Sequence, residues 1–186
     1  MDPVPLASVD ATALRWLRIG ERPLRFELRA GDALLARLEW QKDSGSLAVA
    51  TGAEGAWQLK RSGFLNPHVT VRRAGESAPV ARLSVHLNYH AIDVAGGPSF
   101  RFHRAGVLLP AWKVTAADGR EVLHVEPVRE GRALAGGAVV ASAESSRSAP
   151  FLLLVVLSWY FIALAWFEDE TVVPLERAAL SVAPQP

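Results

Sequence analysis

Histidines are the residues of this sequence best suited to chemistry near neutral pH. An imidazole can carry a proton or bind a metal ion, and His86 and His90 stand four residues apart in HLNYH. If this segment is a regular strand, the two side chains share a face but lie about 13 Å apart. One metal ion cannot bridge that separation, so we interpret both histidines as structural and predict no metal site.

The other candidates for catalysis lack the partners that a reaction needs. His103 lies on the opposite side of its expected strand from Phe100 and Phe102, which predicts a solvated exterior position. The chain has no cysteine and no G-x-S-x-G motif, which excludes a thiolate nucleophile and the nucleophile elbow of a serine hydrolase. The acidic run 168–170 is a set of adjacent carboxylates without further ligands, which makes a poor cation site. We therefore expect no enzyme and no cofactor; an unrecognised enzyme that uses His103 or His90 at a barrel mouth is an open alternative.

The charge balance disfavours a nucleic-acid partner. There are 20 Lys and Arg residues against 19 Asp and Glu residues, so the formal net charge is +1, and we expect no large electrostatic field. Adjacent basic residues occur at Lys60-Arg61 and at Arg72-Arg73. These four residues are our candidates for contacting an anionic lipid headgroup, because each basic residue near such a surface contributes about 1 kcal/mol. The alternative is that Arg72-Arg73 is a charged strand end that prevents edge-to-edge pairing.

Strands must position these residues, because apolar and polar residues alternate along most of the chain. In LRFELR, Leu24, Phe26 and Leu28 alternate with charged residues, which is typical of a half-buried strand. Arg-Ala-Gly occurs three times between such runs, and its glycine can supply the positive φ of a hairpin loop. The pattern predicts roughly ten or eleven strands.

The first residues show no sign of export. The opening MDPVPLASVD contains two aspartates and no continuous apolar stretch, so it does not look like a secretory signal. We expect residues 1–12 to be a loose N-terminal leader and residues 13–186 to form a single domain. The expected location is the cytoplasm, with peripheral membrane association.

The run from Phe151 to Phe167 is too apolar to lie in water. Apart from the Tyr160 hydroxyl, Ser158 is its only polar side chain, so full exposure would be very costly. One alternative is a β-domain anchored by a C-terminal transmembrane helix at 151–167. Such a helix reaches about 25 Å against about 30 Å of hydrocarbon, and acidic residues follow it without a basic cluster. Another alternative is a helix buried in an oligomer interface.

We favour a helix enclosed by the strands of the same chain. Eleven or twelve strands about 4.8 Å apart, tilted near 45°, close at a backbone radius of about 12–13 Å. A helix needs about 5–6 Å of this radius and leaves about 7 Å for inward side chains. We therefore predict a mainly β fold, a closed or nearly closed antiparallel barrel of about 11–12 strands around a central hydrophobic helix at about 150–167. The side chains expected at the core of that helix are Phe151, Leu154, Leu157, Trp159, Phe161, Leu164 and Trp166.

Three segments carry a family resemblance: LRFELRAGDALLARLEW, WKVTAADGREVLHVEP and the apolar PFLLLVVLSWYFIALAWF. Over about residues 14–170, this layout resembles the tubby C-terminal-like superfamily, which includes the LURP-one-related proteins and the phospholipid scramblases. The resemblance implies a barrel of about twelve strands threaded by a hydrophobic helix. It also implies phosphoinositide binding or membrane association, so the expected partner is an anionic phospholipid surface or a protein. The acidic calcium-binding loop of scramblases is not evident, which argues against lipid scrambling.

Overall fold

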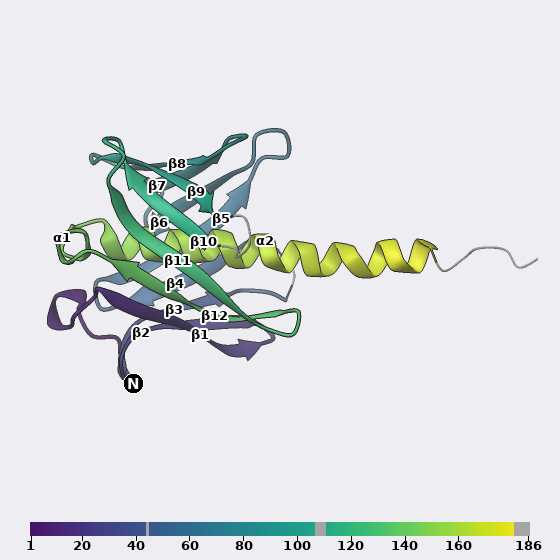
Figure 1. Ribbon diagram of the computed structural model, residues 1–186, viewed down its shortest axis with the longest axis horizontal. Coiled ribbons are helices and arrows are strands. Elements are labelled where there is room, and N and C mark those ends of the chain that lie inside the picture. The colour runs from purple at the N-terminus through teal and green to yellow at the C-terminus, as the bar shows by residue number, and fades with distance from the viewer. Residues whose placement is uncertain (44, 107–110, 181–186) are drawn as a thin grey trace, which may run out of the picture.

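Twelve antiparallel strands close into one barrel in the computed structural model of this chain (Figure 1). The structure describes residues 1–43, 45–106 and 111–180, with side chains described as far as Phe167. Each strand pairs with the next one along the sequence, and β1 pairs with β12 to complete the ring, which confirms the predicted fold class. The strands are β1 (Ala13–Glu21), β2 (Leu24–Ala30), β3 (Ala33–Trp40), β4 (Ala48–Gly52), β5 (Gly55–Ser62), β6 (His68–Arg73), β7 (Pro79–Val85), β8 (His90–Val94), β9 (Ser99–Ala105), β10 (Ala111–Ala116), β11 (Glu121–Glu130) and β12 (Ala133–Ala141).

Alternating burial explains why these segments form strands. In β1, Leu14 and Trp16 are buried whereas the residues on either side of each are exposed, because successive side chains of a strand point to opposite faces. Glycine provides the turns between strands. Gly31, Gly75 and Gly106 have φ values of 56°, 83° and 82°, which confirms the role predicted for the three Arg-Ala-Gly turns.

Helix α2 (Phe151–Leu180) enters the barrel after the short helix α1 (Ala143–Ser146), and its first half occupies the interior (Figure 1). Of the seven side chains predicted for the helix core, five are buried, and Phe161 and Trp166 are partly buried and packed against the core. The helix is longer than the predicted 150–167 and continues beyond the barrel. The acidic residues after Phe167 do not mark the end of the helix. Negative charge is unfavourable in the last turn of a helix, so these residues are better tolerated in its interior.

In a membrane-spanning helix, the apolar side chains of α2 would face lipid. In this fold they pack against the strands instead. Trp159 stacks on Trp16 of β1 with ring centroids 5.6 Å apart, and it meets Phe26 of β2 edge-on at 5.3 Å. Tyr160 stacks on Trp40 of β3 at 5.4 Å. Among the residues that the structure describes, no helix combines the length and the apolarity needed to cross a membrane.

A glycine in the wall allows the helix to approach this closely. A Cβ atom on Gly137 of β12 would lie 2.6 Å from Cζ3 of Trp159 and 2.9 Å from the carbonyl oxygen of Glu126. Both separations are shorter than real Cβ contacts. Gly137 is therefore required by packing, since any side chain here would force the Trp159 ring or the Glu126 backbone to shift.

The N-terminal residues pack against the barrel and are not the loose leader that we expected. This segment includes the 3-10 helix η1 (Leu6–Ser8), and the amide of Val4 donates a hydrogen bond to the carbonyl oxygen of Leu34 at 2.8 Å. Val4, Leu6 and Val9 pack against the hydrophobic core. The end of a barrel exposes apolar core residues, so even a segment without regular periodicity gains free energy by covering them.

Candidate functional site

Helix α2 enters the barrel at one end and leaves it at the other. At the helix-entry end, Leu152 lies against Gly52 of β4. At the other end, named the helix-exit rim here, the Tyr160 hydroxyl donates a hydrogen bond to the carbonyl oxygen of Ser46. Trp166 Nε1 donates to the carbonyl oxygen of Arg132 on the same rim, at 3.1 Å. Because neighbouring strands run in opposite directions, the loops after β5 and β7 also lie on the helix-exit rim.

The four predicted headgroup contacts do not form one cluster. Lys60 of β5 and Arg72 of β6 face outward as diagonal neighbours, a relation that separates Cα atoms by about 7–8 Å. Arg61 lies near the helix-exit rim, where its amide donates to the Tyr160 hydroxyl oxygen at 3.1 Å. Arg73 lies toward the helix-entry end, and its Nη1 donates to a turn carbonyl, that of Glu54, at 3.4 Å. Strand alternation thus separates the two members of each pair.

Positive charge is nevertheless concentrated in one part of the wall. Residues 55–105, named the basic sector here, form β5 to β9 and contain seven Lys or Arg and two Asp or Glu residues, a formal charge of +5. Since the whole chain carries +1, the remaining residues carry −4. The near-zero total, from which we expected no large field, conceals this difference between two parts of the chain. A charge count by segment would have revealed it in the sequence.

Basic side chains dominate the outer surface of this sector. Arg82 of β7 and Arg101 of β9 join Lys60 and Arg72 on the exposed face of the strands. Asp93 of β8 lies opposite Arg82 and also accepts a hydrogen bond from a serine hydroxyl. The outer surface of the sector therefore suits an anionic partner.

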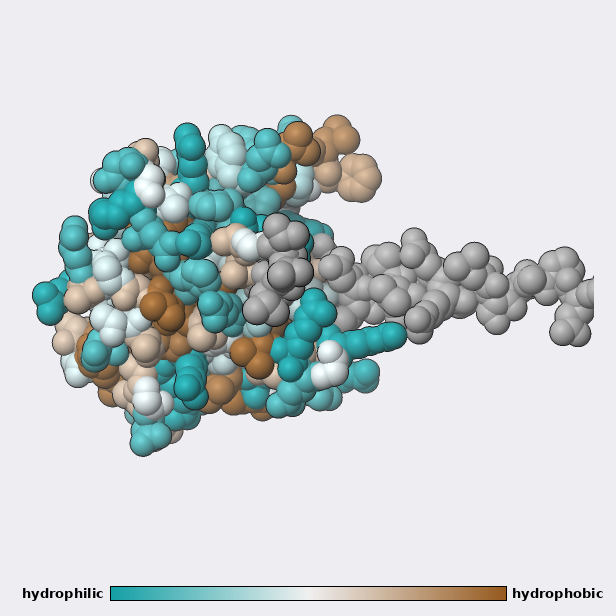
Figure 2. Space-filling model, in the orientation of Figure 1, coloured by the Kyte–Doolittle hydropathy of each residue, from teal (hydrophilic) through white to brown (hydrophobic). Residues whose placement is uncertain are grey.

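Three large apolar side chains project into solvent from two loops of the same sector. Phe64 and Leu65, in the loop between β5 and β6, are 99% and 87% exposed, and Leu87, between β7 and β8, is 99% exposed. These are the highest exposures among the large apolar residues that the structure describes. Hydrophobic side chains are visible at the upper right edge of the barrel in Figure 2. Strand periodicity does not identify these loop residues, although two apolar residues between Gly63 and Pro67 are a usable signal in the sequence.

His86 and His90 have separate environments. His90 packs among aromatic rings, with centroid distances of 4.5 Å to Phe161 and 6.0 Å to Trp112. Burial, and secondarily the nearby His86, lower the pKa of His90 below its ordinary value, so this ring is neutral near pH 7. His86 stacks instead on Tyr89, at 4.9 Å. No group of three or more potential metal ligands occurs within the described ranges of the chain.

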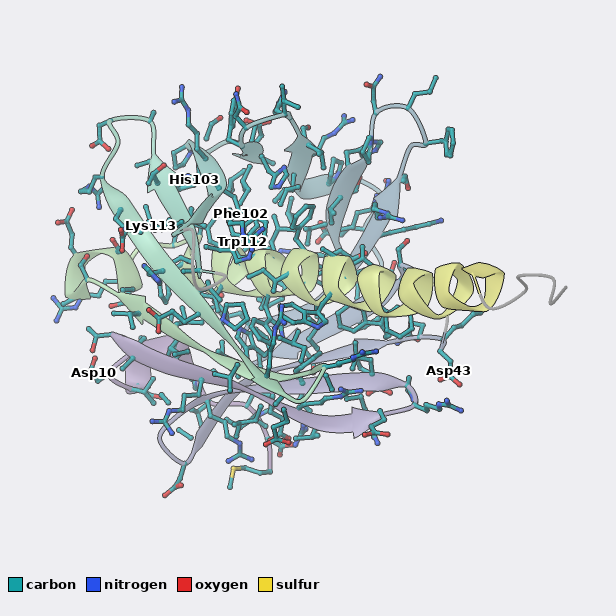
Figure 3. All side chains as sticks on the ribbon, turned by 45° about the vertical axis from the view of Figure 1, so that its right-hand side comes forward. Asp10, Asp43, Phe102, His103, Trp112 and Lys113 are labelled. Carbon is teal, nitrogen blue, oxygen red and sulfur yellow. The ribbon has the colours of Figure 1, made fainter. Side chains whose placement is uncertain are left out.

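His103, the other histidine considered for catalysis, lies on the outer side of β9. It is half-buried and pairs with Lys113 of β10, whose Nζ forms an ion pair of 2.6 Å with Glu121. Figure 3 shows Phe102 and Trp112 beside α2. Strand alternation therefore keeps His103 away from the interior. The acidic run 168–170 lies outside the residues whose side chains are described.

Two adjoining cavities lie at the helix-entry end, with volumes of about 600 Å³ and about 390 Å³. In the larger one, the Ser146 and Ser148 hydroxyls donate to backbone carbonyl oxygens at 3.1 and 2.7 Å. Asp10 accepts hydrogen bonds from the hydroxyl and the amide of Thr12, which hold the pKa of Asp10 below its ordinary value. These polar groups stabilise their own turns, and neither serine hydroxyl is aligned with a base.

Comparisons with known proteins do not assign the chain to a family. No family model matches the sequence, and no match is found among curated proteins or solved structures. The candidate site is therefore defined by geometry alone: the outer surface of the basic sector, together with the exposed apolar loops at its helix-exit rim.

Proposed function

We propose that this protein is a non-enzymatic barrel that binds an anionic phospholipid surface through its basic sector. The observation that supports this function most strongly is the formal charge of +5 on residues 55–105 against −4 on the rest of the chain. Each basic residue near an anionic membrane contributes about 1 kcal/mol. The rest of the chain, with a formal charge of −4, adds no net attraction to such a membrane.

Two further features agree with the proposal. The tubby-like layout implies membrane association for barrels of this kind, and on that resemblance we place the protein at the cytoplasmic membrane surface as a peripheral component. Buried side chains of α2 pack in one cluster with the inward-facing residues of the strands. This packing leaves little room for a substrate around the helix. A binding surface on the outer wall is therefore a better proposal than catalysis inside the barrel.

Vesicle co-sedimentation tests this function directly. The protein should bind vesicles that contain anionic phospholipid, bind neutral vesicles much more weakly, and lose affinity as salt is raised. The variant Lys60→Glu/Arg72→Glu should weaken binding to anionic vesicles by about 30-fold or more, because it removes two contributions of about 1 kcal/mol each. The matched control is Arg15→Glu/Arg22→Glu, which changes the same charge at exposed positions outside the sector.

The control variant distinguishes binding through a local surface from binding that depends only on the net charge of the protein. Equal losses in the two double variants would show that only total charge matters, and equal binding to neutral and anionic vesicles would refute the proposal. If the protein binds neither kind of vesicle, the remaining expectation is that the basic sector contacts an acidic protein partner.

A further inference from the structure

We propose that Phe64, Leu65 and Leu87, named the apolar tips here, insert below the headgroups of an anionic bilayer and fix the orientation of the barrel on it. This inference rests on the proposed function and adds a penetrating contact to an electrostatic one. Large apolar side chains that are 99%, 87% and 99% exposed gain free energy when they leave water. The bilayer is the occupant that matches both the tips and the positive charge beside them.

The two loops that carry the tips are neighbours in space. Val85, at the end of β7, donates its amide to the carbonyl oxygen of Pro67 at 3.3 Å. His68 at the start of β6 pairs with Ser84 near the end of β7. Strand pairing therefore brings the β5–β6 and β7–β8 loops together at the helix-exit rim, although they are distant in sequence.

The loop geometry holds the tips outward. Gly63 has a φ of 84°, and a Cβ atom on this residue would overlap the carbonyl oxygen of Asn66. A tight turn that only glycine tolerates therefore precedes Phe64 and Leu65. In the second loop, the amide of His86 donates to the carbonyl oxygen of Tyr89 at 3.0 Å, and the two rings stack. Local contacts close both turns. The apolar tips are therefore exposed by the shape of the turns and not because the loops are loosely held.

An amphipathic pair of side chains lies next to the second loop, since Tyr89 follows Leu87 by two residues. The guanidinium of Arg101 lies over the Tyr89 ring, 5.3 Å from its centroid. Tyrosine and basic side chains are enriched where a membrane meets water. Helix α2 leaves the barrel along the axis, and the loops after β5 and β7 lie to one side of it (Figure 1). An oblique approach from that side brings the tips and the basic outer wall to the same surface.

Site-specific fluorescence tests penetration, and the absence of cysteine from the chain makes labelling simple. A polarity-sensitive fluorophore on Leu65→Cys or Leu87→Cys should shift to shorter wavelength on vesicles of mixed neutral and anionic phospholipid. Quenchers attached to the acyl chains should then reduce its emission. Ser77→Cys is the matched control, because it is exposed in the same sector but in the turn between β6 and β7, at the other end of the strands.

A variant series gives an independent measurement. Phe64→Ser/Leu65→Ser/Leu87→Ser should weaken vesicle binding by about 10- to 100-fold and leave the unfolding midpoint unchanged, because these side chains are exposed. Leu17→Ser/Val128→Ser removes exposed apolar side chains from β1 and β11 and should leave binding unchanged.

The possible failures are distinguishable. Charge-dependent binding without a fluorescence shift would overturn penetration and leave the proposed function intact. No binding to anionic vesicles would overturn both. Concentration-dependent self-association that the triple serine variant abolishes would also overturn penetration, and it would assign the tips to an interface between two copies of the chain.

Discussion

Replacing Gly137 with alanine would measure how tightly the barrel encloses α2. The added Cβ would lie 2.6 Å from Cζ3 of Trp159 and 2.9 Å from the carbonyl oxygen of Glu126, so a neighbour must shift. The indole cannot retreat freely, because it stacks on Trp16 with ring planes 8° from parallel. We therefore expect Gly137→Ala to lower the free energy of unfolding by about 1–3 kcal/mol, the usual cost of overpacking a core.

Thermal unfolding, followed by near-UV circular dichroism of the tryptophans, is a suitable assay. For a chain of this length, 1 kcal/mol corresponds to about 2–4 °C, so Tm should fall by roughly 2–12 °C. Gly97→Ala is the matched control, because its Cβ would meet Val94 only at 3.5 Å. Combining Gly137→Ala with Trp159→Phe, which shortens the ring, should recover part of the loss. An unchanged Tm in Gly137→Ala, or an equal cost in both backgrounds, would refute the enclosed helix.

Two substitutions test polar contacts of the barrel. Tyr160→Phe removes the hydroxyl that donates to the carbonyl oxygen of Ser46, so urea unfolding should show a loss of about 1–3 kcal/mol; unchanged stability would mean that this contact contributes nothing. Burial by itself raises the pKa of Glu27, but hydrogen bonds from Arg29 and Arg37 more than offset it and hold the pKa below its ordinary value of 4.5. Wild-type stability should therefore be fully present above about pH 4.5 and fall in more acidic solution, whereas Glu27→Gln should start lower at pH 7 and change less; parallel pH profiles would contradict this.

Most of the barrel wall could be predicted because its signals are local. Phe26 and Leu28 are buried as their spacing in LRFELR indicated, since the side that a strand residue faces decides its burial. The helix could be placed inside because its apolar residues, from Phe151 to Leu164, left no face for water. Packing of the N-terminal segment was missed, because Val4 and Leu6 show no period that identifies a buried face.

The candidate site was predicted less well. Lys60-Arg61 and Arg72-Arg73 stand out as adjacent basic residues, yet alternation along each strand turns the two members of a pair to opposite faces. Phe64, Leu65 and Leu87 give no joint signal, because they belong to loops that meet only through the pairing of β6 with β7.

Properties of contiguous residues therefore account for the β wall, the apolar helix and the excess of positive charge in one sector. Alternation, hydrophobicity and charge can each be read from neighbouring positions without knowledge of the fold. Three features are decided only by the folded structure. It groups the apolar tips, it places Lys60, Arg72, Arg82 and Arg101 on one outer face, and it brings the two loops to the same helix-exit rim. Each of these depends on hydrogen bonding between strands that are separate in sequence, and on which loops the alternating strand directions bring to the same end.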